Sequence, residues 1–394
     1  MLSIGSMSED SGQYYMELAR EDYYLAGGEP PGQWLGKGAE QLGMTGQVQK
    51  DYFYNLIDGI APEGTAVLVG RSNGARHHPG WDLTFSAPKS VSVVWSQADQ
   101  AKRTQIQQCQ QEAVQKAIEY LEEEAAVTRR GKGGVRREHA DLVVATFEHG
   151  TSRAQDPQLH THALVLNLGL REDSNFGALD GTELYKHKMA AGAVYRAELA
   201  RQLEQKLGFR AEQHDRAFEI VGVDKKLIRE FSKRREAIER ELKSLGLDGA
   251  KAASIAALET RAVKEHLPRE QLLREWQEIG RQYGFGREQV GALVQLPRPM
   301  EDPQLAANQA ATAALRRLST ERSFFTKRDL VRYTAEESQC RGVGADSARK
   351  AANQLLRSAD VVFVGRHKRD ACYATRETLA IEQGMLTRVE QMKT

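Results

Sequence analysis

Two histidines one residue apart begin an apolar run in the segment QLHTHALVLN, residues 158–167. Because side chains alternate in direction along a β-strand, His160 and His162 would share one face of a strand. A buried polar group without a partner costs roughly 1–3 kcal/mol, so each imidazole needs either a hydrogen bond or a metal ion. The spacing of these two residues alone leaves both interpretations open.

A third histidine favours the metal. In the segment VVATFEHGTS (143–152), the alternation places His149 at the end of a second apolar strand. If this strand pairs antiparallel with residues 159–168, His149 comes close to His160 and His162. Three imidazoles from two neighbouring strands predict a site for one divalent cation with positions left open for a substrate. The alternative is three separately hydrogen-bonded core histidines. A histidine-triad nucleotide hydrolase would carry a further histidine at position 164, where this chain has Leu164.

Tyrosines supply a second group of reactive side chains. The segment QYYMELAREDYY (13–24) holds two pairs, Tyr14–Tyr15 and Tyr23–Tyr24. A phenol attacks a phosphodiester only if its pKa of about 10 is overcome by a base or by sharing charge with a metal. The structural alternative is that these aromatic rings pack on the core.

Single charged residues flank the predicted strands. Asp82 enters the apolar segment WDLTFSA (81–87), where a carboxylate is costly unless a histidine or a metal-bound group pairs with it. A solvated strand end is the alternative. Lys89, just after this strand, and Arg153, between the two histidine segments, are expected to hold phosphate oxygens.

A basic segment, TRRGKGGVRRE (128–138), surrounds a Gly-Gly turn. A hairpin of this composition suits a DNA groove or backbone, although a solvated loop would look the same. The net charge of the whole chain is only +1, so nucleic-acid binding would depend on such local patches. The candidate DNA-binding side chains in it are Arg129, Arg130, Lys132, Arg136 and Arg137.

Composition sets outer limits on these interpretations. The 394 residues are 40% hydrophobic and 28% charged, which excludes a disordered or fibrous chain. No apolar run approaches the roughly 18–20 residues that a membrane-spanning helix needs, and the acidic N-terminal stretch does not fit a signal peptide. The three cysteines form no CxxC pair, which is typical of free thiols in a reducing cytoplasm.

The elements that would position these side chains form two blocks. Residues 1–295 contain strands at 81–87, 140–150 and 159–170, a helix near 103–126, and an almost wholly helical stretch from residue 224. A Pro-rich linker is predicted at 296–304. In residues 305–394, a helix capped by Thr326 and Asp329, a second helix and a basic hairpin outline a winged-helix unit. A small α+β accessory domain without a DNA role is the alternative.

Several motifs together resemble the relaxase domain of conjugative plasmids, of the MobF (TrwC/TraI-like) class in the HUH endonuclease superfamily. The tail, with YATRETLAIEQGML, is similar to the small domain that precedes the helicase in such proteins, but no GxxxxGK[ST] motif follows, so we expect no helicase motor in this chain. The tyrosine pairs lie nine residues apart, slightly further than the family pattern. The matching motifs are the paired tyrosines, GKGAEQLG (36–43), DLTFSAPKSVS (82–92), FEHGTSRAQDPQLHTHALVLN (147–167) and GAVYRAELA (192–200).

The resemblance implies an α+β fold, with a central antiparallel β-sheet, flanking helices and helical "fingers" at about 224–290 that close over DNA. It implies that Tyr14 attacks single-stranded DNA at the nick site, giving a 5′-phosphotyrosyl intermediate, and that Tyr23 serves a second strand transfer. His149, His160 and His162 would bind a divalent metal, Mg²⁺ or Mn²⁺ in the cell. Asp82 would either orient a ligand histidine or accept the tyrosine proton.

The resemblance also implies partners: single-stranded DNA with an adjacent hairpin or duplex at an origin of transfer, relaxosome accessory proteins, and the coupling protein of a type IV secretion system. The expected location is the bacterial cytoplasm, with translocation into the recipient cell alongside the DNA as an option. Two other classes remain open from the residues alone. A metal-dependent phosphodiesterase would use water in place of tyrosine, and a non-catalytic DNA-binding module would need only the basic segments.

Overall fold

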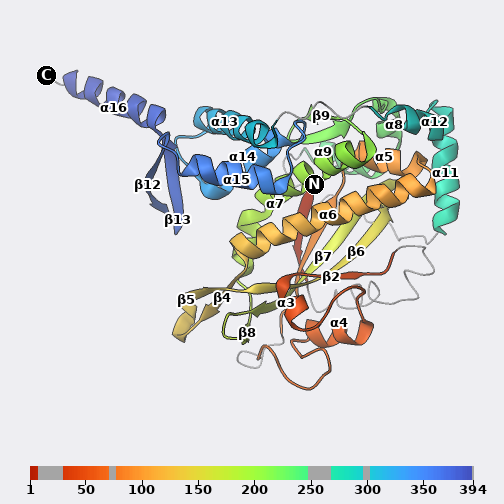
Figure 1. Cartoon of the computed structure of the whole chain (residues 1–394), viewed down its shortest axis with the longest axis horizontal. Coiled ribbons are helices and arrows are strands. Elements are labelled where there is room, and N and C mark those ends of the chain that lie inside the picture. Colours follow the sequence, from red (N-terminus) through yellow and green to blue (C-terminus); the bar gives the residue numbers. More distant parts are fainter. Residues whose placement is uncertain (8–29, 71–76, 247–267, 296–301, 393–394) are drawn as a thin grey trace.

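A six-stranded antiparallel β-sheet forms the centre of the protein (Figure 1). Its order is β1-β3-β7-β6-β2, and β8 pairs with the end of β7. Every neighbouring pair in this sheet runs antiparallel, as we expected. The strands are β1 (Leu2–Ser6), β2 (Gln33–Leu35), β3 (Gly80–Ser86), β6 (Asp141–Thr151), β7 (Pro157–Leu170) and β8 (Phe176–Gly177).

The computed structural model describes residues 1–7, 30–70, 77–246, 268–295 and 302–392. The segment that carries the two tyrosine pairs lies outside these ranges, as does most of the Pro-rich stretch 296–304. Within the described ranges, no helix is both long enough and apolar enough to cross a bilayer.

Alternation along the central strands gives the sheet two apolar faces. Val144 and Val165 belong to the larger core, which is completed by the long helices α6 (Gln100–Ala125) and α7 (Gly181–Leu207). Phe147 and Leu164 point to the opposite face and pack with Phe53 in a smaller cluster. The short helices α3 (Lys37–Gln41) and α4 (Lys50–Ile57) contribute to this second face. The strands expected at 81–87, 140–150 and 159–170 correspond to β3, β6 and β7.

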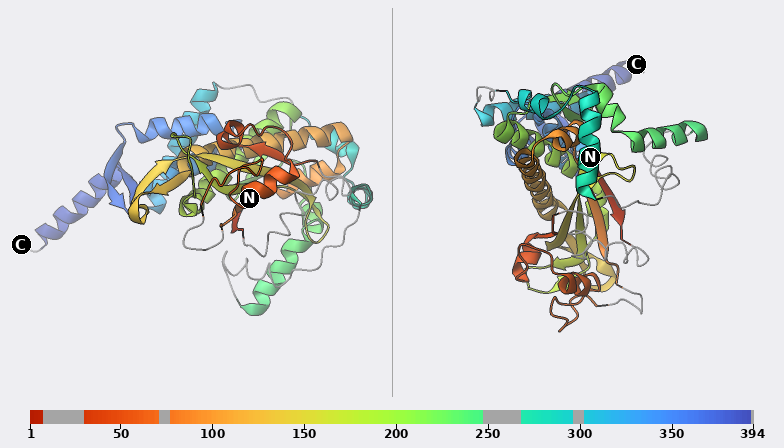
Figure 2. Two further views of the ribbon diagram at one scale, coloured as in Figure 1. Left: turned by 90° about the horizontal axis from the view of Figure 1, so that it is seen from below. Right: turned by 90° about the vertical axis from the view of Figure 1, so that its right-hand side faces the viewer.

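The helical stretch after residue 224 contacts the sheet through α5 (Lys89–Gln97). Trp276 packs on Trp95 of α5, with ring centroids 5.9 Å apart, and its backbone carbonyl accepts a hydrogen bond from Gln97. In both views of Figure 2 the green helix α9 projects from the body. The helices described in this stretch are α8 (Lys225–Glu230), α9 (Lys233–Leu245), α11 (Arg269–Gln282) and α12 (Arg287–Ala292), preceded by the hairpin β9 (Ala211–His214) and β10 (Ala217–Ile220).

The C-terminal unit follows the order helix, strand, helix, helix, hairpin, helix. The expected capping box of Thr326 and Asp329 is present, because Thr326 Oγ1 accepts from the backbone N–H of Asp329 and the Asp329 carboxylate accepts from the N–H of Thr326. The helix that it begins is the second of this unit, since a helix that the sequence did not predict precedes it. Its elements are α13 (Pro303–Glu321), β11 (Phe325–Thr326), α14 (Lys327–Ser338), α15 (Ala345–Leu356), β12 (Val361–His367), β13 (Asp370–Thr375) and α16 (Arg376–Gln391).

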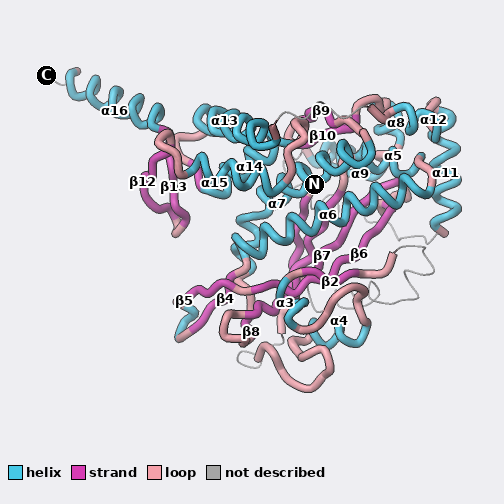
Figure 3. Tube along the Cα trace, in the orientation of Figure 1, coloured by secondary structure: helices cyan, strands magenta, loops and turns pink. Residues whose placement is uncertain are grey.

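This unit packs directly on the first block. Leu330 and Val331 of α14 belong to the same hydrophobic core as the sheet and helices α6 and α7. Lys327 and Arg349 form ion pairs with Glu124 and Glu123 of α6. Figure 3 shows α6 and α7 of the first block together with α13, α14 and α15 of this unit, with α16 extending away from the body.

A buried hydrogen-bond network joins the two long helices to the sheet. The Tyr195 hydroxyl on α7 donates to Gln110 Oε1 on α6 at 2.6 Å. Gln110 Nε2 in turn donates to the Phe85 carbonyl on β3 and to Thr161 Oγ1 on β7. Burial raises the pKa of Tyr195, which keeps its hydroxyl a donor. All of these groups are buried, so the network must be complete to be stabilising.

We predict that Tyr195→Phe lowers the free energy of unfolding by about 1–3 kcal/mol, because Gln110 Oε1 loses its donor while the ring still packs. Urea denaturation followed by circular dichroism measures this change. The matched control is Tyr185→Phe on the same helix, where the side chain is exposed and the expected change is below about 0.5 kcal/mol. Equal stabilities for the two variants would show that the network is not stabilising.

Candidate metal centre and active site

The register between β6 and β7 brings the three histidines together. His149 lies directly opposite His160 in the antiparallel ladder, and His162 lies opposite Phe147. Because Phe147 and Leu164 face the smaller core cluster, the alternation places all three imidazoles on that same face. The antiparallel pairing inferred from the sequence is therefore present.

The three rings surround a common point. Their centroids are separated by 5.3 Å (His149 to His160), 5.1 Å (His149 to His162) and 5.2 Å (His160 to His162). One ligating nitrogen from each residue lies within 4.8 Å of the others. Small rotations would bring all three to the roughly 2.1 Å bond length typical of imidazole ligands. Among the described residues, this is the group of His, Cys, Asp and Glu side chains that could hold a metal ion.

Hydrogen bonds orient two of these rings for metal binding. His160 Nδ1 lies 2.8 Å from the Gln158 carbonyl, and His162 Nδ1 lies 2.9 Å from Asp82 Oδ2. A carbonyl and a carboxylate only accept, so each Nδ1 carries the hydrogen, and Nε2 is the ring nitrogen whose lone pair a metal would use. Asp82 reaches His162 from β3, the next strand of the sheet, and Thr84 Oγ1 lies 3.3 Å from the same carboxylate. The donor set fits a divalent cation.

Lys89 lies beside this site but points at protein atoms. Its Nζ donates to the Pro157 carbonyl at 2.9 Å and contacts Gln158 Oε1 at 3.3 Å. Burial lowers the pKa of Lys89 to about 8, although the nearby Asp156 and Glu219 carboxylates favour the charged form. The ammonium therefore fixes the start of β7, next to the residue whose carbonyl orients His160.

The turn between β6 and β7 is held by the helices that follow residue 224. The Asp156 carboxylate accepts the backbone N–H of Arg234 at the start of α9, at 3.4 Å. Trp276 Nε1 on α11 donates to the Gln155 carbonyl at 2.8 Å. At Gly150, next to His149, a Cβ atom would lie only 2.5 Å from the Trp95 ring, so this position has room only for glycine. Sequence reasoning missed Asp156 and Trp276, because their partners are distant in the chain and no local pattern marks them.

The basic hairpin lies at the other end of the central strands. It is formed by β4 (Val127–Arg130) and β5 (Arg136–His139), and its base packs near residues 171–180, just after β7. With about 3.3 Å per residue, the ten residues from His160 to Leu170 separate it from the histidines by about 30 Å.

All four arginines of the hairpin form ion pairs. Arg129 and Arg137 both contact Asp180, and Arg137 also contacts Glu183. Arg130 pairs with Asp173 and Glu138, and Arg136 pairs with Glu138. Lys132, at the exposed tip, forms no ion pair with any residue in the described ranges. The side chains most available to a ligand here are Lys132 and Arg136, whose side chain is 75% exposed.

Arg153 lies in the β6–β7 turn, at the same end of the sheet as the histidines. The structure does not test the predicted tyrosine nucleophiles. The described residues do not include Tyr14, Tyr15, Tyr23 and Tyr24, so their distance from the histidines stays a prediction.

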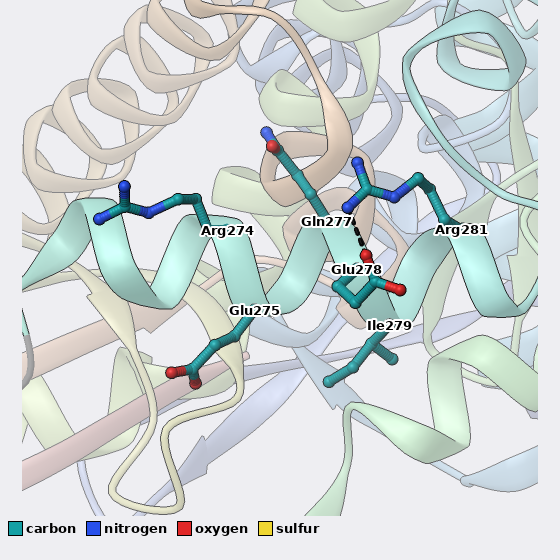
Figure 4. Close-up of a pocket in the computed structure, with 6 residues that line it drawn as sticks. All are labelled: Arg274, Glu275, Gln277, Glu278, Ile279 and Arg281. Carbon is teal, nitrogen blue, oxygen red and sulfur yellow. Dashed lines mark hydrogen bonds and ion pairs between the residues drawn. The ribbon is translucent and has the colours of Figure 1, made fainter.

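A shallow, open pocket of about 770 Å³ runs along α11 (Figure 4). Arg281 and Glu278 form an ion pair within its lining, and Arg274 extends from the preceding turns of the helix. Its lining contains none of the predicted site residues: it consists of Arg274, Glu275, Gln277, Glu278, Ile279 and Arg281.

The site is an antiparallel sheet with three convergent histidines on adjacent strands and a carboxylate behind one of them, a donor set that fits one divalent cation. A family model described as TrwC relaxase matches residues 8–283. The chain belongs to the TrwC relaxase family, as its motifs indicated.

Two curated relatives are similar along nearly the whole chain. Both are described as multifunctional conjugation protein TraI, one from Escherichia coli and one from its strain K12. They are 30% and 31% identical over 390 and 396 residues, in each case 93% of this chain. The alignments cover 21% and 22% of those proteins, so the chain spans about a fifth of their length.

Solved structures of similar proteins carry DNA and metal. The conjugative relaxase TrwC in complex with oriT DNA, in a copper-bound form, is 36% identical with a TM-score of 0.64. A TrwC complex with a 27-mer DNA comprising the recognition hairpin and the cleavage site is 35% identical with the same TM-score. Each covers 72% of this chain and 99% of the solved chain.

We predict that Asp82→Asn weakens divalent-metal binding about 10–100-fold, because an amide neither fixes the His162 tautomer nor raises the basicity of its ring as a carboxylate does. Calorimetric titration with Mn²⁺ measures the affinity. The control is Asp141→Asn, at the far end of β6, where the carboxylate contacts Gln41. Unchanged affinity in Asp82→Asn, or unchanged metal stoichiometry in the triple His149→Ala, His160→Ala, His162→Ala variant, would contradict the site.

Proposed function

We propose that this chain cuts and rejoins one strand of DNA at a plasmid origin of transfer, using a tyrosine nucleophile. The observation that carries the proposal is the histidine site, in which the Gln158 carbonyl and the Asp82 carboxylate accept from Nδ1 of His160 and His162 and orient the two rings. Its support beyond geometry is the family, whose solved members are described in complex with oriT DNA.

The proposed reaction exchanges one phosphodiester for another. The Tyr14 phenol loses its proton and its oxygen attacks the scissile phosphorus, while the bond from phosphorus to the 3′ oxygen breaks. The products are a 5′-phosphotyrosyl enzyme and a 3′-hydroxyl, which takes up a proton. Because bond number and type are conserved, the step is reversible without ATP. Tyr23, with Tyr24 beside it, would serve the second transfer that rejoins the strand.

The roles of the chain's own residues follow from the contacts. His149, His160 and His162 would hold one divalent cation, which when bound polarises the phosphate oxygens and stabilises the developing charge. Asp82 keeps the His162 ring in the required tautomer and orientation, which we prefer to a role as proton acceptor because its carboxylate faces His162 Nδ1 at 2.9 Å. Mg²⁺ or Mn²⁺ is proposed for the cell, since abundance there outweighs the preference of imidazole for later metals.

The other proposed parts surround this centre. The helices of residues 224–290 would close over the single strand as fingers, and Arg153, with Lys89 behind it, would lie near the scissile phosphate. Residues 305–394 would form a winged-helix unit, consistent with its element order and its three-stranded sheet β11-β13-β12. By family resemblance, relaxosome accessory proteins and a type IV secretion coupling protein are the proposed partners, in a bacterial cytoplasm.

We predict that Tyr14→Phe abolishes the covalent adduct with an oligonucleotide spanning the nick site, because it removes the attacking oxygen and keeps the ring. Denaturing gel electrophoresis detects the adduct. The matched control is Tyr15→Phe, which should retain most of it, since adjacent helical residues point about 100° apart and one geometry presents one of them. Tyr23→Phe should cleave but be impaired in rejoining.

Mass spectrometry should locate the adduct on the peptide that carries Tyr14. An adduct on Tyr23 or Tyr24 would reverse the tyrosine assignment. Cleavage without any adduct would instead favour the water-using phosphodiesterase, and binding without cleavage would favour a DNA-binding module.

We also propose that the β4–β5 hairpin contacts DNA phosphates, and predict that Lys132→Glu with Arg136→Glu flattens the salt dependence of binding. The log–log slope should fall by roughly 0.7–0.9 for each phosphate that the variant no longer neutralises. Arg137 is left intact because it is tied to Asp180 and Glu183. Fluorescence anisotropy at several salt concentrations gives the slope, with the exposed Arg316→Glu as the control. An unchanged slope would make the hairpin a solvated loop.

A further inference from the structure

The tip of the β12–β13 hairpin carries four consecutive basic or titratable side chains, Arg366, His367, Lys368 and Arg369, all exposed. We call this hairpin tip the wing tip. None of the four forms an ion pair with a residue in the described ranges, whereas Asp370, which lies opposite His367 directly beside the turn, forms ion pairs with Lys186 and Arg328. The tip is therefore a concentrated positive charge held on a fixed support.

The backbone of the turn at the wing tip has a conformation that is unfavourable for the residues that form it. Lys368 and Arg369 both have positive φ, 46° and 76°, in a two-residue hairpin turn. Such turns strongly favour Asn-Gly or Gly-Gly, because other residues are strained in the left-handed region. Two long basic side chains at these positions support a functional interpretation of the charge.

Apolar side chains accompany the charges. Phe363 on β12 is 55% exposed, and Phe324, 49% exposed, lies with its ring centroid 6.4 Å from that of His367. A merely solvated turn has no need of exposed aromatic rings, whereas Phe can make apolar contact with the thymine methyl group in a major groove.

The wing tip and the β4–β5 hairpin belong to the same end of the molecule. A chain of ion pairs links them: Arg137 contacts Glu183, Glu183 contacts Lys186, and Lys186 contacts Asp370, the residue directly after the wing tip. In Figure 1 both hairpins lie on the left, with β12 and β13 above β4 and β5. We treat their exposed basic residues as one edge, of which the β4–β5 part lies about 30 Å from the histidines by the strand length given above.

We propose that this edge, made by Lys132 and Arg136 of one hairpin and Arg366, Lys368 and Arg369 of the wing tip, binds double-stranded DNA beside the nick site. The proposal rests on the proposed function for the identity of the DNA, and it adds a binding surface beyond residues 8–283, the part matched by the family model. A two-stranded ribbon fits the roughly 12 Å wide major groove, and the basic tips match its phosphate rims. Two rigid hairpins spaced along one edge suit a stiff duplex better than a flexible single strand.

The experiment uses the full chain with the charge reversal Arg366→Glu, Lys368→Glu, Arg369→Glu. The matched control reverses three exposed basic residues on or near the helices of the same unit, Arg316, Arg341 and Lys350, to glutamate. Two probes are used: an oligonucleotide with a duplex stem beside the nick site, and a short single strand that spans only the nick site. A second wing variant with glutamine at the three positions removes charge without adding repulsion.

We expect the wing reversal to raise the Kd for the stem probe at least about tenfold and to lower its salt slope by about 0.9 for each phosphate no longer neutralised, with roughly half the effect in the glutamine variant. The control should bind like the unmodified protein, and adduct formation on the short single strand should be unchanged in all variants. An unchanged Kd and slope, equal weakening in the control, or weakening confined to the single strand would overturn the proposal. If the unmodified protein forms no adduct on the short strand, the proposed function is overturned. The Kd values of the wing variants for the stem probe would still test whether the wing tip binds duplex DNA.

Discussion

The antiparallel register of β6 with β7 determines where the histidines can meet. Side chains have a period of two along a strand, so a slip of one residue would move His160 and His162 to the face covered by α6 and α7. In the observed register His149 lies opposite His160, and the buried valines on the other face make any slip costly. The same register sets the length of the turn that Asp156 and Trp276 hold. Burial of the valines on one face of the sheet thus determines that the three histidines meet on the opposite face.

Rigidity around the histidines comes from three directions. Asp82 fixes His162 from the neighbouring strand, Lys89 fixes the start of β7 from α5, and α9 and α11 hold the β6–β7 turn. The helices that would cover the DNA therefore contact the turn between the metal ligands directly. This arrangement gives a physical route by which the position of those helices and the geometry of the metal site influence each other.

The sequence predicted the features that follow from local periodicity. Alternation identified β3, β6 and β7, and placed the three histidines on one face. It did not predict β1 or β2, because LSIGS and QWL are too short and too polar to show a period. It left the partner of Asp82 open, because the β3–β7 register depends on packing between distant segments. It also could not show that Arg137 is tied to Asp180 and Glu183, which lie more than forty residues further along the chain.

The three histidines all fall within a single hairpin, residues 149–162, whereas Asp82 is 80 residues away from His162 in the chain. Closing a short loop costs little entropy, so the hairpin can gather its imidazoles early in folding, before β3 docks. A divalent ion present at that stage would stabilise the β6–β7 pairing from which the sheet grows. When β3 docks, it brings the Asp82 carboxylate to His162, which would raise the affinity of the site for the metal. The metal would in this way act as a folding ligand as well as a cofactor, and its availability during synthesis would influence the yield of native protein.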